Sequence, residues 1–579
     1  MSMLLTYIDK FGDWNPQLFR ELKGRLKVRN LSIAGIIAVG IQILLLLTFS
    51  GQLPIDPNTL NAPPLQFSRY CTATPPPNSY APYKQLYCIP DLLGNWIIDW
   101  QLWWLDIFKS LSVIGLFILL VAGTYLLIAD LSKEENRGTL NFIRLSPRSS
   151  HNILLGKMLG VPSVIYFLCL ILLPLHLIAG FQADIDSGLI LAYYGAIIAS
   201  CAFFFSLSLL FGLVSSGLGG FQSFLGSGIV LQFLFVTTSI ILSSHDFISH
   251  TPLDWIIIFY PGTILSYLVK STYIPVDTAG IDYETLNNFA WYGKQIWQNS
   301  FLGIGFILAN YILWTYWINQ ALDRRFRNPN ATWLSKSNSY VLSGIFIIIS
   351  TGFVFQSGRY GRFEHHIFDN IIVLQMFMIV FACLLMVALS PQRQTLHDWA
   401  RYRHQTPQNR RSLLRDLILG EKSPSTLAIA LNLGIMFAYL TPAILIAPIK
   451  HPFAVLLGLF VSMNILVIYA LIGQRILLFK LPKPSLIATA VIAILMVVPP
   501  IIFGVLDLAP HEIVTPWFFT IFSLAASNNH LQLLTMMSVL FPLLSQWGMI
   551  ALGGFEMSKR LQKAGESSTK SLLNSTVSR

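Results

Sequence analysis

Residues 187–244 read SGLILAYYGAIIASCAFFFSLSLLFGLVSSGLGGFQSFLGSGIVLQFLFVTTSIILSS, without a single Asp, Glu, Lys or Arg. A helix needs about 20 apolar residues to cross the ~30 Å hydrocarbon core of a bilayer, so this run is long enough for two crossings. The glycine-rich residues 215–220 are a natural turn between them. The stretch therefore predicts a helical protein that crosses a membrane several times.

The rest of the chain has the same character. It is 54% hydrophobic and 11% charged, against roughly 25% charged residues in a soluble domain. The other uncharged stretches are 31–50, 110–129, 158–183, 295–322, 337–358, 370–392, 423–449, 452–474, 485–506 and 513–555. With the two spans in 187–244 they predict an all-α protein of about twelve transmembrane helices.

The positive charges predict an orientation. If the N-terminus lies inside, the loops on that side hold 30 of the 38 Lys and Arg residues. Cytoplasmic loops of membrane proteins carry such an excess. We therefore expect a multi-pass protein of the plasma (inner) membrane with both termini in the cytoplasm. The net charge of +11 then reflects topology, and no nucleic-acid partner is predicted.

The chain also shows signs of an internal repeat. Residues 31–338 and 339–553 would form two six-helix units, followed by a cytoplasmic tail at 554–579. Each unit has a long charged inner loop after its second span, at 130–157 and 390–422, and an apolar outer segment too short or too broken to cross, at 255–269 and 513–527. Because both units would begin on the inside, they are expected to be parallel repeats.

The cytoplasmic N-terminus, residues 1–30, contains a candidate amphipathic helix. Asn15 can cap it, and Pro16 suits its first position. Leu18, Phe19 and Leu22 then share one face, while basic residues occupy the others. The pattern is typical of a helix that lies on a membrane surface, although a generic basic segment before a membrane anchor fits it equally well.

The first inner loop begins DLSKEENRGTLNFIRLSP at residue 130. Ser132 with Glu135 matches a capping box and predicts a helix start, and Gly138 weakens the middle of that helix. Ser146 before Pro147 predicts the cap and first turn of a second helix. The loop is therefore expected to be a short helical structure on the inner face, on which a motor protein could push.

This loop resembles the coupling element of the permease subunits of type-2 ATP-binding-cassette exporters. The resemblance covers about residues 10–340. It is carried by the motifs EExRGTL at 134–140, SP at 146–147, ILLGK at 153–157, NP at 15–16 with REL at 20–22, and RRFxNP at 324–329. It implies a membrane permease that exports a lipidic, glycan or other amphipathic substrate, with ATP-binding-cassette ATPase subunits supplied in trans. It also implies that the ATPase docks on Glu134, Glu135, Arg137, Gly138, Thr139 and Leu140.

The second half departs from this pattern. Its loop at 390–422 has no paired glutamates and no glycine before Thr395. It could be a second permease unit with a degenerate docking loop, or an appendage that never touches an ATPase. The resemblance therefore leaves open whether a second permease chain is required.

Several activities are disfavoured by what the sequence lacks. No Gly-x-x-x-x-Gly-Lys-Ser/Thr phosphate loop occurs, so we expect a separate polypeptide to hydrolyse ATP. We also expect no enzyme activity of the chain itself and no bound cofactor or metal. The predicted spans have no ionisable group near mid-membrane, which argues against an ion-coupled secondary carrier. That carrier and a non-transporting membrane scaffold are the alternatives to the permease.

One covalent link is expected outside the membrane. Cys71 and Cys88 both lie in the predicted outer loop 51–106. An oxidising compartment would favour a disulfide between them, and the alternative is a pair of buried free thiols. Membrane lipid is the remaining predicted partner of the chain.

Overall fold

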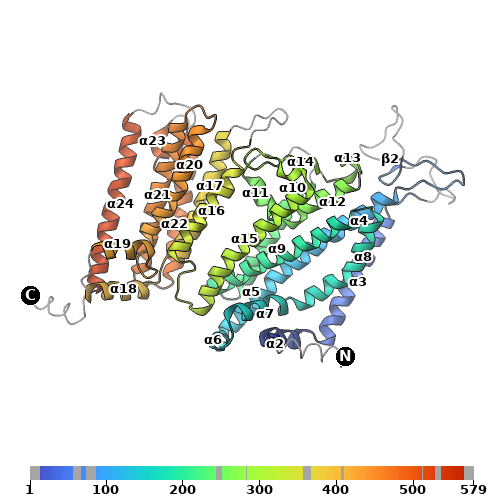
Figure 1. The fold of residues 1–579 in the computed structure, drawn as a ribbon, viewed down its shortest axis with the longest axis horizontal. Coiled ribbons are helices and arrows are strands. Elements are labelled where there is room, and N and C mark those ends of the chain that lie inside the picture. Colours follow the sequence, from blue (N-terminus) through green and yellow to red (C-terminus); the bar gives the residue numbers. More distant parts are fainter. Residues whose placement is uncertain are drawn as a thin grey trace, which may run out of the picture. The chain divides into compact units, whose positions relative to one another are not determined.

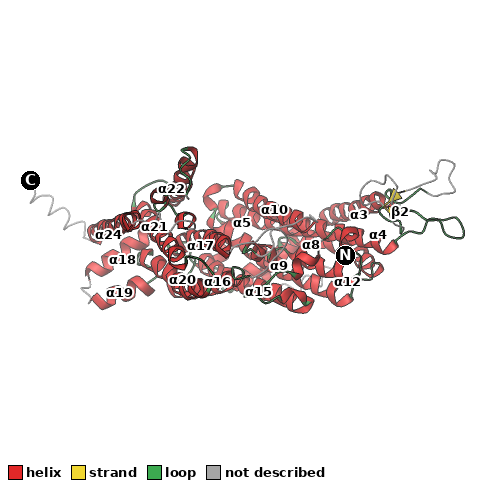
Figure 2. Ribbon diagram, turned by 90° about the horizontal axis from the view of Figure 1, so that it is seen from above, coloured by secondary structure: helices red, strands yellow, loops and turns green. Residues whose placement is uncertain are grey.

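The computed structural model is helical almost throughout (Figure 2). It describes residues 14–55, 67–72, 86–242, 251–281, 283–356, 367–405, 410–510, 513–527 and 536–565. Within these residues, the strands β1 (Phe67–Ser68) and β2 (Leu86–Tyr87) form a small antiparallel ribbon. Eleven helices among the described residues are long and apolar enough to cross a membrane. The helical class predicted from the apolar runs is confirmed, and the eleven long apolar helices fit a multi-pass membrane protein.

The chain divides into two compact units near residue 326. Unit 1 contains most of residues 1–326. Its longer helices are α2 (Pro16–Arg25), α3 (Val28–Ser50), α4 (Trp100–Phe117), α5 (Gly123–Asn136), α7 (Ser150–Gly160), α8 (Ser163–Gln182), α9 (Ser187–Val214), α10 (Phe221–Leu242) and α15 (Ser300–Arg327). A π-helical turn at Ile118–Ala122 joins α4 to α5, so that a single helical element runs from Trp100 to Asn136.

The shorter helices of unit 1 gather at its two ends. These are α6 (Thr139–Arg144), α11 (Leu253–Ile258), α12 (Leu265–Ser271), α13 (Val276–Ala279) and α14 (Tyr283–Asn287). Figure 1 shows α2, α6 and α7 at one end of the unit and α12, α13 and α14 at the other. The apolar segment 255–269, expected to be too broken to cross, is divided into α11, a 3-10 turn and α12.

Unit 2 contains most of residues 327–579. Its helices are α16 (Lys336–Gly352), α17 (Ile367–Leu389), α18 (Arg393–Gln405), α19 (Arg410–Leu419), α20 (Thr426–Ile446), α21 (Pro452–Leu478), α22 (Pro484–Val505), α23 (Val514–Trp517) and α24 (Met536–Gly565). The predicted inner loop 390–422 contains α18 and α19, and the segment 513–527 contains only α23 and a 3-10 turn. The span predicted at 337–358 corresponds to α16, which has 17 residues and is not among the eleven.

Two helix starts predicted from capping patterns are wrong. No helix begins at Ser132, because α5 continues without a break through that residue to Asn136. Ser132 is instead buried. The helix predicted to start at Ser146 begins at Ser150, and Ser149 caps it by accepting a hydrogen bond from the Asn152 backbone amide.

The disulfide expected from the outer loop is present in the structure. Cys71 and Cys88 are bonded to each other, with their Cα atoms 4.8 Å apart, and both are fully buried. The bond lies close to the β1–β2 ribbon. It therefore ties together two parts of a loop that leads into α4.

Candidate functional site

The candidate site is built on a close contact between α2 and α7. Gly156 and Gly160 lie one turn apart on α7, where α2 packs. A Cβ atom at Gly156 would lie 2.7 Å from Asn15 Oδ1, and one at Gly160 would lie 2.5 Å from the Glu21 Cβ atom. Small residues at this spacing let two helix backbones approach closely, so any larger residue at either position would push α2 away.

Asn15 fixes the start of α2 at this contact. Its side-chain oxygen accepts hydrogen bonds from the backbone amides of Gln17 and Leu18, both at 3.1 Å. Its side-chain nitrogen donates to the Asn152 carbonyl on α7 at 2.6 Å. The cap predicted from the sequence is therefore present, and it also joins the two helices.

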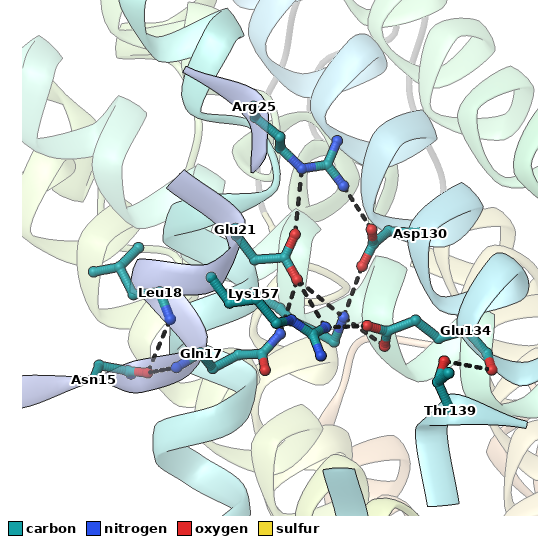
Figure 3. A network of polar contacts seen from close by, with 10 residues as sticks. Asn15, Gln17, Leu18, Glu21, Arg25, Asp130, Glu134, Thr139 and Lys157 are labelled. Carbon is teal, nitrogen blue, oxygen red and sulfur yellow. Dashed lines mark hydrogen bonds and ion pairs between the residues drawn. The ribbon is translucent and has the colours of Figure 1, made fainter. Parts of the chain in front are cut away.

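A buried lysine lies at the centre of the site (Figure 3). The Lys157 side chain is 0% exposed, and its Nζ lies 2.7 Å from Asp130 Oδ2 and 2.7 Å from Glu134 Oε2. Glu21 Oε1 lies 3.7 Å from the same nitrogen. Asp130 and Glu134 are one turn apart on α5, so the lysine of α7 links α5 to α2.

Two arginines of α2 complete the network. Arg25 Nη2 lies 2.5 Å from Asp130 Oδ1, and its Nε lies 3.3 Å from Glu21 Oε2. Arg20 forms an ion pair with Glu134 and another, at 3.2 Å, with Glu21. We call Glu21, Asp130, Glu134, Lys157, Arg20 and Arg25 the ion-pair network. Its three carboxylates are balanced by three cations, which is how buried charges are made tolerable.

The three carboxylates also have the spacing of metal ligands. Oxygen atoms of Glu21, Asp130 and Glu134 lie within 4.8 Å of one another. The Lys157 ammonium already lies among them, in contact with all three side chains. It supplies the positive charge that a metal ion would bring, so the arrangement favours a structural ion-pair network over a metal centre.

A sharp turn separates α5 from α6. Gly138 has a φ of 69°, in the left-handed region that favours glycine. Its amide donates to the Glu135 carbonyl at 2.9 Å, and the Thr139 hydroxyl donates to the Glu134 carbonyl at 3.1 Å. Gly138 therefore ends α5 and lets the chain reverse into α6, a different role from the weak point inside a helix that we expected.

Two sides of α6 have opposite environments. Leu140 and Ile143 are buried against the rest of unit 1, whereas Phe142 is 79% exposed and Leu145, the C-cap residue that follows α6, is 83% exposed. Glu135 interacts electrostatically with Arg144; burial lowers the pKa of that guanidinium, and Glu135 opposes the shift. The outward side of α6 therefore presents two large apolar side chains beside basic and acidic groups.

A groove runs from α6 to the start of α2. It has a volume of about 330 Å³ and lies between the N-terminal end of α2, α6 and the start of α7. Its wall includes the aromatic residues Trp14 and Phe142 and the cations Arg20 and Arg148. An apolar groove with a basic rim suits a partner segment that combines apolar and acidic side chains.

The predicted docking residues therefore lie in different environments. Arg137, Gly138 and Thr139 are exposed at the turn, while Leu140 is buried. Glu134 binds Lys157 and Arg20 within unit 1. Sequence analysis missed the ion-pair network and the groove because both depend on α2, which lies more than a hundred residues before Asp130, α6 and α7 in the sequence. The ILLGK and REL motifs do contain Lys157, Arg20 and Glu21, and they were the available signal.

The corresponding segment of unit 2 is arranged differently. Leu396 and Ala400 of α18 are buried in a cluster with Leu471, Met557 and Leu561. Lys336 donates hydrogen bonds to the Leu417 and Pro424 carbonyls at 2.8 and 2.9 Å, which fixes the end of α19. The described residues of this segment form two amphipathic helices, and no counterpart to the short α6 occurs among them.

No protein-family model, no curated protein and no solved structure matches this chain.

Proposed function

We propose that this chain is the membrane subunit of an ATP-driven exporter and that its ATPase is a separate polypeptide. The ATPase docks on the outward side of α6 and the adjoining groove, and closure of the ATPase pushes on segment 130–157. The feature that carries this proposal is a short helix with one exposed apolar residue, Phe142, and a second, Leu145, at its C-cap, joined to the ion-pair network through α5. The motif resemblance of the same segment to type-2 permeases supports it.

The geometry suits the transmission of force. Phe142 and Leu145 offer a contact area, and α6 is joined to α5 through the Gly138 turn. The ion-pair network then connects α5 to α2 and α7. A push on α6 would consequently reach three helices, because breaking a buried ion pair costs several kcal/mol.

The remaining features of the proposal concern topology. We propose twelve spans in two six-helix units, with α16 as the seventh span, and cytoplasmic termini in the plasma (inner) membrane. The excess of Lys and Arg on one side of the chain supports this orientation. The substrate would be lipidic, glycan or otherwise amphipathic, and a second permease chain is needed if unit 2 does not receive an ATPase.

The alternative of an ion-coupled carrier needs a titratable group that is free to bind the ion. The buried Asp106 of α4 is a candidate for such a group. Its carboxylate, however, already forms ion pairs with Lys109 at 2.7 Å and Arg69 at 3.0 Å, and it accepts a hydrogen bond from the Tyr70 hydroxyl at 3.1 Å. A carboxylate with three partners is suited to a structural role. It therefore favours the ATP-driven proposal.

The test is to purify the tagged chain gently from its native membrane and identify the proteins that accompany it. We expect a nucleotide-binding subunit, and we expect Phe142→Ser with Leu145→Ser to remove it. The matched control is Tyr273→Ser, which changes a 92% exposed aromatic residue just after α12. Figure 1 shows α12 at the opposite end of unit 1 from α6. Transport by the purified chain alone that follows an ion gradient and ignores ATP would refute the proposal.

A further inference from the structure

A second site lies inside unit 1, away from the ion-pair network. A cavity of about 240 Å³ opens between α4, α8 and α9. Fourteen residues line it: Leu111, Ser112, Gly115, Leu116, Leu119, Tyr166, Cys169, Leu170, Leu172, Leu173, His176, Tyr193, Tyr194 and Ile197. All belong to helical elements long and apolar enough to cross a membrane. An apolar cavity of about 150 Å³ already holds a molecule the size of benzene, so this one can hold a longer hydrocarbon group.

The polar groups of the cavity gather around His176. Ser112 donates its hydroxyl proton to the Phe108 carbonyl at 2.8 Å, so its oxygen accepts from His176 Nε2 at 2.8 Å. With that proton on Nε2, the His176 Nδ1 accepts from the Tyr194 hydroxyl at 2.6 Å. The hydrogen bonds thus assign one tautomer to the neutral imidazole. They also use the donors of all three side chains: the Ser112 hydroxyl, the His176 Nε2–H and the Tyr194 hydroxyl.

The Tyr193 hydroxyl is a further hydrogen-bond donor in the wall of the cavity. Tyr193 is 1% exposed, and its hydroxyl, which lies near Ser112, makes no hydrogen bond of normal geometry to any described residue. An unsatisfied buried hydroxyl costs about 1–3 kcal/mol, so such a group calls for a partner. The Tyr194 and Ser112 oxygens still have lone pairs that can accept. The cavity therefore offers one spare donor beside spare acceptors.

This combination selects a particular kind of head group. A neutral hydroxyl can accept from Tyr193 and donate to the Tyr194 or Ser112 oxygen. A carboxylate or phosphate would need several donors or a cation, and none of the described residues that line the cavity is Lys or Arg. The same network disfavours a serine hydrolase, because the Ser112 proton points to a backbone carbonyl and His176 cannot remove it.

The shape of the helices agrees with a binding site. The π-helical turn at Ile118–Ala122 contributes Leu119 to the wall, and such turns are frequent at functional sites. A Cβ atom added at Gly115 would meet nothing within 4 Å. Leu170 is 61% exposed on the apolar surface of unit 1, so a ligand can enter sideways from lipid.

We propose that this cavity binds one hydrocarbon chain that ends in a neutral hydroxyl group, such as that of a long-chain alcohol or another hydroxyl-bearing lipid. The hydrocarbon lies against the leucines, and the hydroxyl bonds to Tyr193 and Tyr194 beside Ser112. The site goes beyond the coupling proposal and does not depend on it, because binding needs neither ATP nor an ATPase.

The test uses the full chain in phosphatidylcholine nanodiscs with two photoreactive probes, the diazirine derivatives of dodecan-1-ol and of dodecanoic acid. We expect the alcohol to label the cavity-lining residues of α8 and α9. Unlabelled dodecan-1-ol should compete, while dodecane should not. Equal labelling by the acid would overturn the neutral hydroxyl, and equal competition by dodecane would overturn the polar contacts.

Variants locate the binding within the cavity. Gly115→Leu should reduce labelling about tenfold by filling the open space, and Tyr193→Phe should reduce it by a similar factor through loss of one hydrogen bond. Gly195→Leu is the matched control, since a Cβ at this α9 glycine also meets nothing within 4 Å and it does not line the cavity. Unchanged labelling in a correctly folded Gly115→Leu protein would overturn the site. If Gly115→Leu does not fold, the competition of dodecan-1-ol and dodecane against labelling of the wild type decides whether the site exists.

Discussion

Replacing Lys157 by methionine tests the ion-pair network most directly. Methionine keeps most of the volume of the side chain and removes its charge, which leaves Glu21, Asp130 and Glu134 facing only two arginines. Removing one partner of a buried ion pair costs about 3–5 kcal/mol. Arg20 and Arg25 still neutralise part of the charge, and they are 50% and 27% exposed, so we expect the lower end, about 3 kcal/mol.

The expected loss can be measured in two ways. A loss of about 3 kcal/mol corresponds to a melting temperature about 4–5 °C lower for a unit the size of unit 1, since the unfolding entropy is about 2.1 cal/mol/K per residue. Trypsin should also cut α2 at Arg20 and Lys23 more quickly, because α2 loses its tie to α5. The control is Lys133→Met, which removes an exposed lysine of α5 and should change neither result.

A double variant separates charge from packing. Lys157→Met with Glu134→Leu removes both members of a pair, so it should be more stable than Lys157→Met alone by about 1–2 kcal/mol. Two results would contradict this. The free energies of unfolding lost in Lys157→Met and in Glu134→Leu could simply add in the double variant, or Lys157→Met could have the melting temperature of the wild type. In either case the network does not hold α2, α5 and α7 together, and our account of force transmission fails.

Two further predictions concern the turn before α6 and the segment of unit 2. Gly138→Ala should destabilise the chain by about 1 kcal/mol because φ is positive there with open space around it, whereas Gly138→Asn should cost less; equal melting temperatures for the two variants would contradict this. Lys336→Met should destabilise unit 2 by about 2–3 kcal/mol, because it removes the hydrogen bonds that the Leu417 and Pro424 carbonyls accept from the buried Lys336 ammonium. A melting temperature equal to that of the wild type would contradict this role of Lys336.

Much of the fold could be predicted because a membrane span depends mainly on length and composition. The run 187–244 is divided into α9 and α10, with the turn at Ser216–Leu218 where glycine and serine cluster. The start of α4 was placed too late, at 110 instead of Trp100, since Asp106 and Lys109 interrupt the uncharged run. These two charges pair with each other inside the helix, and pairing is invisible to a count of charged residues.

The candidate site was predicted only in part, for a related reason. The motif around Gly138 identified the segment, and local rules identified the Asn15 cap. The sequence around Ser132 matches a capping box, but a cap is useful only where a helix begins, and α5 is already helical there. The role of Lys157 depends on residues 21, 130 and 134 lying together in space, which no pattern within one segment can indicate.

The close contact between α2 and α7 explains how the site can be rigid and still transmit a displacement of α6. Gly156 and Gly160 remove the side-chain layer between α2 and α7, so the ion pairs of Lys157 form at short range and in near-complete exclusion from water. Charges held in this way resist separation, and a helix attached to them moves as part of the group. By contrast, Phe142 and Leu145 lie beyond the Gly138 turn and make few contacts of their own, since most of their surface is exposed. A partner that covers these two residues would therefore change little within α6 itself, and its displacement would pass to α2, α5 and α7 together.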